Sequence, residues 1–292
     1  MTLSQFFRHV YTSRRYLSDS TQLTYRATIN AFQGWHGKPV LLSKLTPDLL
    51  RGFLRDYHEE HAASSVNGKR QVLMTLWRWA YRWGKTTSKP PEDHEIPKLP
   101  VPQRVPTAWT LEEFGQLIRA CEVARPIIMR SVVWDCRHWR ALFLTIYDTG
   151  ERLEALLQTD RCDLSHTGHL TIRGEHRKGK RRDIVRKLHP QTMEAIEALP
   201  PHRLLFPWPI RRRAIWIEIE PILHAAGLPV DRRSKFHCGR RTSATQVAVA
   251  LGIAAASKHL DHSSVQLTID SYVDPRQLPD QDVADALPRP AL

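Results

Sequence analysis

The sequence predicts a mainly α-helical protein of the α+β class with two domains, and three observations support this prediction. Apolar residues recur with helical spacing along most of the chain, a proline-rich stretch interrupts this pattern, and one pair of short apolar runs flanks a basic tract. A length of 292 residues allows two ordinary domains with buried cores. We therefore expect a helical domain at residues 1–88, a linker at 89–106, and a mostly helical domain with a small antiparallel β-sheet at 107–292.

Three amphipathic helices are expected in the first domain. Residues 21–35 place Leu23, Ile29 and Phe32 at roughly helical spacing, and Thr46-Pro47 offers a cap and a first-turn proline for a second helix. The third helix, residues 64–83, has an apolar face together with many basic and aromatic side chains. These side chains are Lys69, Arg70, Arg78 and Arg82, with Trp77, Trp79 and Trp83.

Prolines mark the boundary between the two domains. Residues 84–106 contain Pro90, Pro91, Pro97, Pro100, Pro102 and Pro106. This composition cannot form a regular element, and we expect a semi-extended connector. Thr110 and Glu113 then form a capping box, in which each side chain satisfies the other's backbone N–H group, so that a helix begins there.

The second domain is expected to combine helices with one strand pair. An apolar helix over residues 132–147 should end at Gly150. Two short apolar runs between residues 169 and 188 flank a basic tract and predict a hairpin with a long basic tip, the only convincing strand pair. Further helices are expected at residues 190–198, 214–226, 241–251 and 264–272, followed by a proline-bounded tail at 278–292 with one short helical piece.

The composition is that of a basic globular protein. The net charge of +13 favours polyanionic partners, nucleic acid foremost, although a merely basic protein is the alternative. The helix at 64–83 is accordingly either a DNA-facing helix or a solvated basic face with tryptophans in the core. No apolar run is as long as a membrane span and the N-terminus lacks a secretory signal, so we expect a soluble, cytoplasmic protein. The four separated cysteines, Cys121, Cys136, Cys162 and Cys238, fit reduced thiols.

Two arginines of the second domain could bind one phosphate. Cleaving and rejoining a phosphodiester without a metal requires positive donors on the non-bridging oxygens, a nucleophile, and an acid for the departing oxygen. Arg152 follows Thr149-Gly150-Glu151 at a helix end, and Arg240 comes three residues after His237. Two guanidinium forks could clamp a phosphate in a geometry that lysine cannot reproduce.

Several motifs occur in an order that identifies a family. These are Thr149-Gly150-x-Arg152, the basic hairpin, His237-x-x-Arg240 with Thr242 and Ala244-Thr245 behind it, and Leu260-Asp261-His262-Ser263-Ser264 followed by Tyr272. Over residues 107–275 the chain resembles the tyrosine recombinases, that is, phage integrases and Xer-type recombinases. The resemblance implies a four-helix, SAM-like core-binding domain at the N-terminus and a mostly helical catalytic domain after it.

The resemblance also implies roles for the residues that match. Tyr272 would attack the scissile phosphate to give a 3′-phosphotyrosyl link and a free 5′-hydroxyl, while Arg152 and Arg240 would hold the non-bridging oxygens. Because the bond energy is stored in the protein–DNA link, no cofactor, metal or ATP is expected.

Proton transfer is assigned to residues of the hairpin tip and to two histidines. Lys178, or Lys180 as the rival assignment, would protonate the leaving 5′ oxygen. His237 would serve in proton transfer at the tyrosine and phosphate, and His262 would donate a hydrogen bond to a phosphate oxygen.

The partners implied are double-stranded DNA and further copies of the chain. The two domains would form a clamp around the duplex, in the nucleoid, and a homotetramer on two sites would exchange strands through a Holliday junction. The task would be site-specific integration, excision or dimer resolution, with accessory DNA-bending or directionality proteins as further partners. The tail, with Val283, Ala284 and Leu287, could dock in a neighbouring protomer, and an additional arm-binding domain is not expected.

Three alternatives compete with this interpretation. His259 and His262, with His237 and Cys238 upstream, could be drawn as a metal site, but the spacing is not a standard zinc pattern and the basic surroundings repel a cation. A metal-dependent nuclease would need paired carboxylates, and no clear set is present. A non-catalytic DNA-binding protein of the same fold would bind a site and leave the DNA uncut.

The chain departs from the family pattern at four places. Ala155 stands where glutamate is often found, with Glu154 beside it, so that a buried partner has shifted. Asp261 replaces a usual glycine and could perturb the pKa of His262 or hold its ring. Arg241 replaces a frequent histidine, and the segment at residues 185–188 lacks the common valine-proline-leucine, which leaves the hairpin register open.

Overall fold

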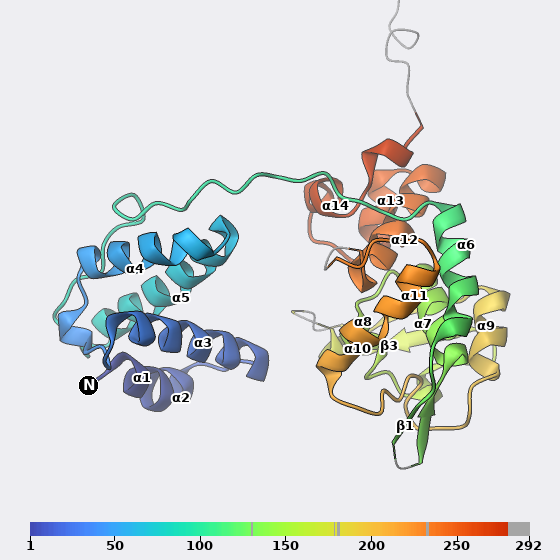
Figure 1. The fold of residues 1–292 in the computed structure, drawn as a ribbon, viewed down its shortest axis with the longest axis horizontal. Coiled ribbons are helices and arrows are strands. Elements are labelled where there is room, and N and C mark those ends of the chain that lie inside the picture. Colours follow the sequence, from blue (N-terminus) through green and yellow to red (C-terminus); the bar gives the residue numbers. More distant parts are fainter. Residues whose placement is uncertain (130, 178, 180–181, 232–233, 280–292) are drawn as a thin grey trace, which may run out of the picture. The chain divides into compact units, whose positions relative to one another are not determined.

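The computed structural model describes residues 1–129, 131–177, 179, 182–231 and 234–279. The chain divides into two compact units, Met1–Gln103 and Arg104–Leu292. Unit 1 is helical, and unit 2 is mostly helical with two small antiparallel sheets (Figure 1). The predicted mainly helical fold class is confirmed. Over the described ranges, no helix has the length and apolar character that crossing a bilayer requires.

Unit 1 contains the three expected helices and two helical segments that were not predicted, one at its N-terminus and a 3₁₀ turn at Leu42–Lys44. The elements are α1 (Leu3–Gln5), a π-helical turn (Phe6–Tyr11), α2 (Thr12–Arg14), α3 (Asp19–His36), α4 (Pro47–Glu60) and α5 (Ala63–Arg82). The Thr46 side chain accepts a hydrogen bond from the Leu49 N–H group and Pro47 is the first helical residue, as the sequence predicts. Phe6, Phe32, Phe53 and Trp77 are buried in the core of this unit.

The first half of the proline-rich stretch packs on α5 and is not a free connector. Ile96 is buried, and its carbonyl accepts a hydrogen bond from Arg70. Arg70 also forms an ion pair with Asp93 at 2.7 Å, and its side chain is only 3% exposed. Arg70 is therefore unavailable to DNA, and its inclusion among the DNA-facing residues was wrong, because a distant segment supplies its partners.

The tryptophans of α5 fit both interpretations of this helix. Trp77 lies in the core and donates a hydrogen bond from Nε1 to the Ser88 carbonyl. Trp83 is half-buried, with the Arg14 guanidinium 4.9 Å from its ring centroid. Trp79 is likewise half-buried, and the Arg15 and Arg82 guanidinium groups lie 5.1 and 5.2 Å from its ring. These cation–π contacts leave a basic, aromatic surface at one end of α5.

Unit 2 contains nine α-helices and four strands in the part of the chain that the structure describes. The helices are α6 (Leu111–Ala120), α7 (Cys136–Thr149), α8 (Leu153–Leu156), α9 (Pro190–Glu197), α10 (Ile215–Glu218), α11 (Glu220–Ala225), α12 (Phe236–Leu251), α13 (Ile253–His259) and α14 (Val265–Ser271), with a 3₁₀ turn (Pro275–Gln277) after them. The strands are β1 (Ile127–Met129), β2 (Val132–Trp134), β3 (His169–Ile172) and β4 (Ile184–Lys187). The Thr110–Glu113 capping box at the start of α6 is confirmed.

Several expectations about these elements were wrong. Residues 132–134 form strand β2, paired antiparallel with β1 so that Ile128 lies opposite Val133, and α7 begins only after the Asp135 cap. Helix α12 begins at Phe236, five residues earlier than predicted, so that His237 and Arg240 lie within the helix. The helix expected at 214–226 is divided into α10 and α11, and α13 was not predicted.

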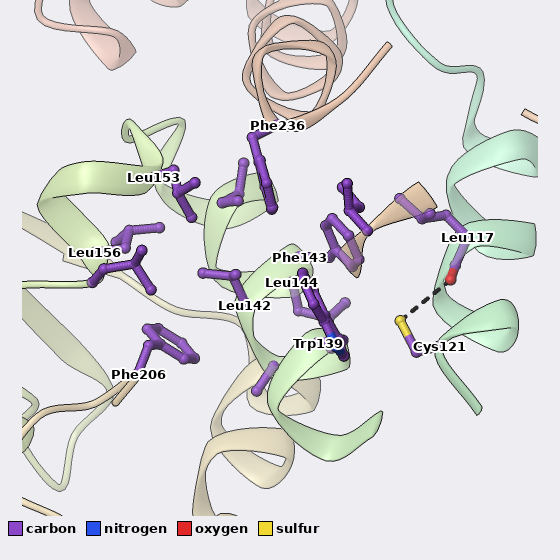
Figure 2. Packing of buried hydrophobic residues seen from close by; sticks show 14 of the residues in the cluster. Leu117, Cys121, Trp139, Leu142, Phe143, Leu144, Leu153, Leu156, Phe206 and Phe236 are labelled. Atoms are coloured by element: carbon purple, nitrogen blue, oxygen red, sulfur yellow. Dashed lines mark hydrogen bonds between the residues drawn. The ribbon is translucent and has the colours of Figure 1, made fainter. Parts of the chain in front are cut away.

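Aromatic packing brings the first half of α7 close to the start of α12. Trp139 and Phe143 on α7 stack with Phe236 at the start of α12, with ring centroids 6.3 and 6.1 Å apart (Figure 2). Gly239 lets the two helices approach, because a Cβ atom at this position would lie 3.1 Å from the Ile146 side chain. The loop after α7, which holds Arg152, therefore lies beside Arg240.

Candidate active site

The loop after α7 is shaped by Gly150. This residue has a φ of +61° and ends the helix, with its N–H group donating to the Ile146 carbonyl. Glu151 and Arg152 follow, and Arg152 is the half-exposed residue that precedes α8. A Cβ atom at position 150 would lie 2.8 Å from both His259 and Leu260. The loop thus requires glycine for its backbone conformation and for the close approach of the α13 end.

Substituting Gly150 with alanine is expected to destabilise the protein through both effects. The left-handed conformation costs about 1–2 kcal/mol for an L-residue, and overpacking adds about 1–3 kcal/mol. Gly227→Ala is the matched control, because Gly227 has a φ of +69° and a Cβ atom there would meet nothing within 4 Å. Denaturant unfolding should show a larger loss for Gly150→Ala than for Gly227→Ala. Equal losses would mean that the approach of His259 and Leu260 is not tight.

Arg240 is a buried charge at the centre of the site. Its side chain is 1% exposed and donates to the carbonyls of Gly150 and Leu260, the latter at 3.0 Å. Nη2 also lies 3.2 Å from Nε2 of His262. The buried Nε has no hydrogen-bond partner among the described residues. One guanidinium thus ties together the α7 loop and the α13–α14 loop, and keeps an N–H group for a further acceptor.

The electrostatics around Arg240 favour an anion. Burial, and then the charge of Arg152, lower the pKa of Arg240 to about 10, which leaves the group protonated at neutral pH. Glu151 opposes this shift, but its Oε1 atom lies 4.0 Å from Nη1 of Arg240 and also binds Arg177. Arg152 and Arg240 thus bring two positive charges together, and the Glu151 carboxylate, which also binds Arg177, offsets them only in part. A bound phosphate would complete the charge balance.

His262 and Tyr272 lie against Arg240. The Tyr272 ring centroid is 5.3 Å from the Arg240 guanidinium carbon and 4.5 Å from the His262 ring. The nearby Tyr272 phenol also raises the pKa of Arg240, against the larger lowering by burial. Since arginine only donates, Nε2 of His262 accepts from Arg240, and Nδ1 carries the proton that faces the Thr268 hydroxyl at 2.9 Å.

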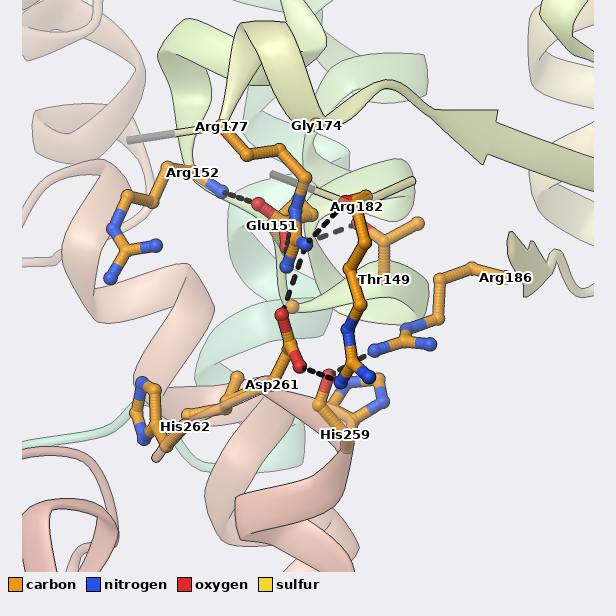
Figure 3. A network of polar contacts seen from close by, with 12 residues as sticks. Thr149, Glu151, Arg152, Gly174, Arg177, Arg182, Arg186, His259, Asp261 and His262 are labelled. Atoms are coloured by element: carbon orange, nitrogen blue, oxygen red, sulfur yellow. Dashed lines mark hydrogen bonds and ion pairs between the residues drawn. The ribbon is translucent and has the colours of Figure 1, made fainter. Parts of the chain in front are cut away.

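A second arginine cluster lies beside the first. The Arg177 guanidinium contacts Glu151 at 2.7 Å and Asp261 at 3.0 Å, and Arg182 contacts Asp261 at 2.6 Å (Figure 3). Arg177, Glu151 and Asp261 are buried. In the view of Figure 3, the Arg152 and His262 side chains lie to the same side of this cluster. The α7 loop, the β3–β4 connection and the α13–α14 loop thus meet at these charges.

The remaining site residues of the sequence prediction are placed differently. His237 is exposed on α12, three residues before Arg240. Lys178 and Lys180 lie outside the described residues, as does the tail at 280–292 with Val283, Ala284 and Leu287. The structure therefore brings together Arg240, His262 and Tyr272, with Arg152 near enough to act on the charge of Arg240.

His259 is part of the packing. Its Nε2 lies 2.8 Å from the Ser243 hydroxyl, and burial, followed by the charges of Arg186 and Arg240, lowers the pKa of His259 to about 4. The ring is therefore neutral at neutral pH. Within the described ranges, no group of three or more His, Cys, Asp and Glu side chains could hold a metal ion.

Comparisons with known proteins agree with this architecture. Residues 3–84 match the family model of the phage integrase N-terminal SAM-like domain. A lambda integrase dimer bound to a COC′ core site superposes with a TM-score of 0.72 at 18% identity, covering 97% of each chain. The chain has the tyrosine-recombinase fold.

Two further recombinase structures share this fold. A lambda integrase tetramer bound to a Holliday junction has a TM-score of 0.70 at 18% identity, covering 90% of this chain and 75% of that one. XerH bound to a palindromic difH substrate, in a post-cleavage complex, has a TM-score of 0.64 at 19% identity, covering 94% and 82%. No curated protein matches the sequence.

Within the recombinase fold, the structure accounts for two of the departures from the family pattern. Ala155 is buried and brings no charge, whereas Glu151 is buried beside Arg240 and Arg177 and supplies the carboxylate. Asp261, with a φ of +52°, binds Arg177 and Arg182. The sequence reasoning missed Glu151 and Arg177 as site residues. The missing glutamate at 155 was the available signal, because it implied a carboxylate elsewhere in the loop.

Proposed function

We propose that this chain is a site-specific tyrosine recombinase that cleaves and rejoins double-stranded DNA through a 3′-phosphotyrosyl intermediate. The observation that supports it most is the position of Arg240, which is buried, lacks a partner at Nε among the described residues and lies against the Tyr272 ring. A phosphate that accepts from this guanidinium would lie in the plane of its N–H groups, next to the Tyr272 ring. The same group would thus bind the substrate and orient it toward the nucleophile.

Arg152 and Arg240 would stabilise the negative charge that develops on the phosphate. Negative charge builds up on the non-bridging oxygens as the Tyr272 oxygen bonds to phosphorus and the bond to the 5′ oxygen breaks. Fixed guanidinium groups stabilise this charge without reorganising, because Arg240 is already held by the carbonyls of Gly150 and Leu260. The phosphodiester energy is kept in the new P–O bond to tyrosine, so rejoining needs no ATP and no metal.

Two protons must move for this step to balance. The phenol proton passes to a histidine, for which His237 and His262 are the candidates, His262 only if its Nε2 leaves the contact with Arg240. A protonated His262 would then donate to a phosphate oxygen. The 5′ oxygen takes a proton from Lys178 or Lys180, which follow the buried Arg177 in the sequence.

The charge and the fold support the proposed substrate and assembly. A net charge of +13 suits a DNA duplex, and binding should weaken steeply with salt as counterions are released. The fold is shared with a lambda integrase tetramer bound to a Holliday junction, which supports a homotetramer that exchanges strands through such a junction. Integration, excision or dimer resolution would be the biological outcome.

Covalent capture tests this proposal. The protein is incubated in EDTA with a library of nicked duplexes of random sequence. After cleavage the short fragment with the 5′-hydroxyl diffuses away, so the strand cannot be rejoined and the covalent intermediate is trapped. We expect an adduct that resists detergent, yields to protease and forms equally well with or without EDTA. Sequence-specific binding with no adduct would instead assign a non-catalytic DNA-binding function, and adduct-free cutting that EDTA abolishes would assign a metal-dependent nuclease.

A further inference from the structure

Helix α14, which leads to Tyr272, buries little of its own surface. Thr268 is the buried residue of this helix, whereas its apolar side chains Val265, Leu267 and Ile269 are 41–44% exposed. The Tyr272 N–H group donates to the Thr268 carbonyl at 3.0 Å, which fixes how Tyr272 follows the helix. Because the helix itself packs weakly, contacts outside it are needed to set the position of Tyr272 in unit 2.

The chain becomes firmly packed immediately after Tyr272. Val273 is 3% exposed and packs with Ala248 of α12 and Ala256 of α13. Asp274 is 1% exposed, although aspartate is rarely buried unless it is paired. The two residues that follow the phenol therefore anchor it from its C-terminal side.

Asp274 joins this segment to two other parts of unit 2. Its N–H group donates to the hydroxyl of Thr245, a fully buried residue of α12, at 3.0 Å. Its Oδ2 atom accepts from the Ala108 N–H group at 3.1 Å, in the segment before α6. Burial raises the pKa of Asp274, but hydrogen bonds from Arg276 and Ala108 outweigh this effect and hold the pKa below its usual range. The side chain is therefore an ionised carboxylate, which only accepts.

The segment before α6 is itself fastened to α12. The Trp109 N–H group donates to the Thr242 hydroxyl at 2.9 Å, and Trp109 is 3% exposed. Thr242 follows Arg240 by two residues on the same helix. Hydrogen bonds thus connect Asp274 with the helix of Arg240 by two routes, one direct and one through this segment.

We propose that Asp274 is a positioning residue that holds the Tyr272 segment on α12 and so presents the phenolic oxygen to a phosphate bound at Arg240. Asp274 does not contact the reacting atoms and acts through Tyr272. This role rests on the recombinase function proposed above.

A residue that positions the nucleophile affects cleavage and rejoining differently. In cleavage, the Tyr272 oxygen must reach phosphorus before the bond to the 5′ oxygen breaks, and a loose segment adds the free energy of ordering it. In the covalent adduct the tyrosine is already bonded to phosphorus, so the segment is ordered when the 5′-hydroxyl attacks and the phenolate leaves. Loss of the anchor therefore raises the transition state and the adduct equally above the intact complex. Cleavage slows, and rejoining keeps its rate.

The rates of these two half-reactions test the proposal. Asp274→Ala removes the acceptor for the Ala108 N–H group. On a duplex identified by covalent capture, we expect adduct formation at saturating DNA to slow by roughly 10-fold to 100-fold, the effect of misplacing a reacting group. Rejoining is started by adding a strand with a 5′-hydroxyl to the trapped adduct, and its rate should stay within about threefold of that of the unmodified protein. A normal rate of rejoining also shows that the variant is folded.

Thr245→Val breaks the direct route and leaves the carboxylate in place. Valine nearly keeps the shape of threonine but lacks the hydroxyl that accepts from the Asp274 N–H group. It should show the same pattern as Asp274→Ala, with slower cleavage and unchanged rejoining.

Asp135→Ala is the matched control for the loss of a cap and an ion pair. Asp135 accepts from the Arg137 N–H group at 3.1 Å and binds its guanidinium at 2.6 and 2.9 Å. Asp274 binds Arg276 in the same way, at 3.1 Å and at 2.6 and 2.8 Å. Asp135 caps the start of α7, at the other end of that helix from Gly150. Its replacement should leave both rates unchanged.

The outcomes separate the positioning role from the proposed function itself. Equal slowing of cleavage and rejoining by Asp274→Ala, or an undiminished rate of cleavage, overturns the positioning role while the recombinase function stands. Slowing of cleavage by Asp135→Ala to the same extent also overturns it. If the unmodified protein forms no adduct, the recombinase function is wrong and the positioning role is rejected with it.

Discussion

Tyr272→Phe is expected to bind site DNA with unchanged affinity and to form no covalent adduct. The variant loses only the phenolic oxygen, and the ring that lies 5.3 Å from Arg240 and 4.5 Å from His262 is kept. Removal of a nucleophile abolishes the step that it performs, so adduct formation should fall by on the order of 10⁴-fold or more. Single-turnover assays on a duplex identified by covalent capture measure the rate of adduct formation. A gel-shift titration on the same duplex measures the affinity for DNA.

Tyr147→Phe is the matched control for this variant. Tyr147 lies on α7 with its ring 4.7 Å from Phe114, and burial raises the pKa of its hydroxyl. It should form adduct at the rate of the unmodified protein. An adduct that still accumulates with Tyr272→Phe would show that the nucleophile is another residue.

Arg240→Lys is expected to slow adduct formation by about 10²-fold to 10³-fold, the effect of removing one preorganised donor to a developing oxyanion. The guanidinium reaches the Gly150 carbonyl, the Leu260 carbonyl and His262 at once, and retains Nε for the substrate. An ammonium group donates from a single point and cannot span these partners. Rates at saturating DNA, with thermal unfolding of the variant, separate a loss of transition-state stabilisation from a loss of folded protein.

Arg276→Lys provides the comparison for a surface position. Arg276 is 63% exposed and forms an ion pair with Asp274, so its replacement should leave the rate within about twofold. A rate for Arg240→Lys that also stays within about threefold would remove Arg240 from the phosphate site, and with it the main support for the proposed function.

Local patterns were sufficient for the elements that have local causes. The caps at Thr46 and Thr110 and the glycine stop at Gly150 depend on neighbouring residues, and all three lie where the sequence predicts. The apolar run at residues 132–134 was misassigned because a short run of valine and tryptophan fits a strand as well as a helix. Only its pairing with residues 127–129 distinguishes the two, and that pairing is a tertiary contact.

The partners of buried charges could not be predicted in the same way. Arg70 and Arg177 both lie in basic stretches that look solvated, yet each is neutralised by a carboxylate that is 23 or more residues away in the sequence. Asp261 was recognised as unusual because it replaces a glycine, but its contacts with Arg177 and Arg182 became evident only in the folded chain. The roles of Tyr272, Arg152, Arg240, His237, His262 and the lysines Lys178 and Lys180 all stay predictions.

The central claim is that separate arginines and histidines converge on one phosphate within reach of the Tyr272 oxygen. Mass spectrometry of the trapped and nuclease-trimmed adduct tests this claim most directly, because it identifies the modified residue and the DNA end together. We predict a single tryptic peptide carrying a 3′-phosphonucleotide on Tyr272. A nucleotide attached to any other residue, or through a 5′-phosphate, would contradict the account.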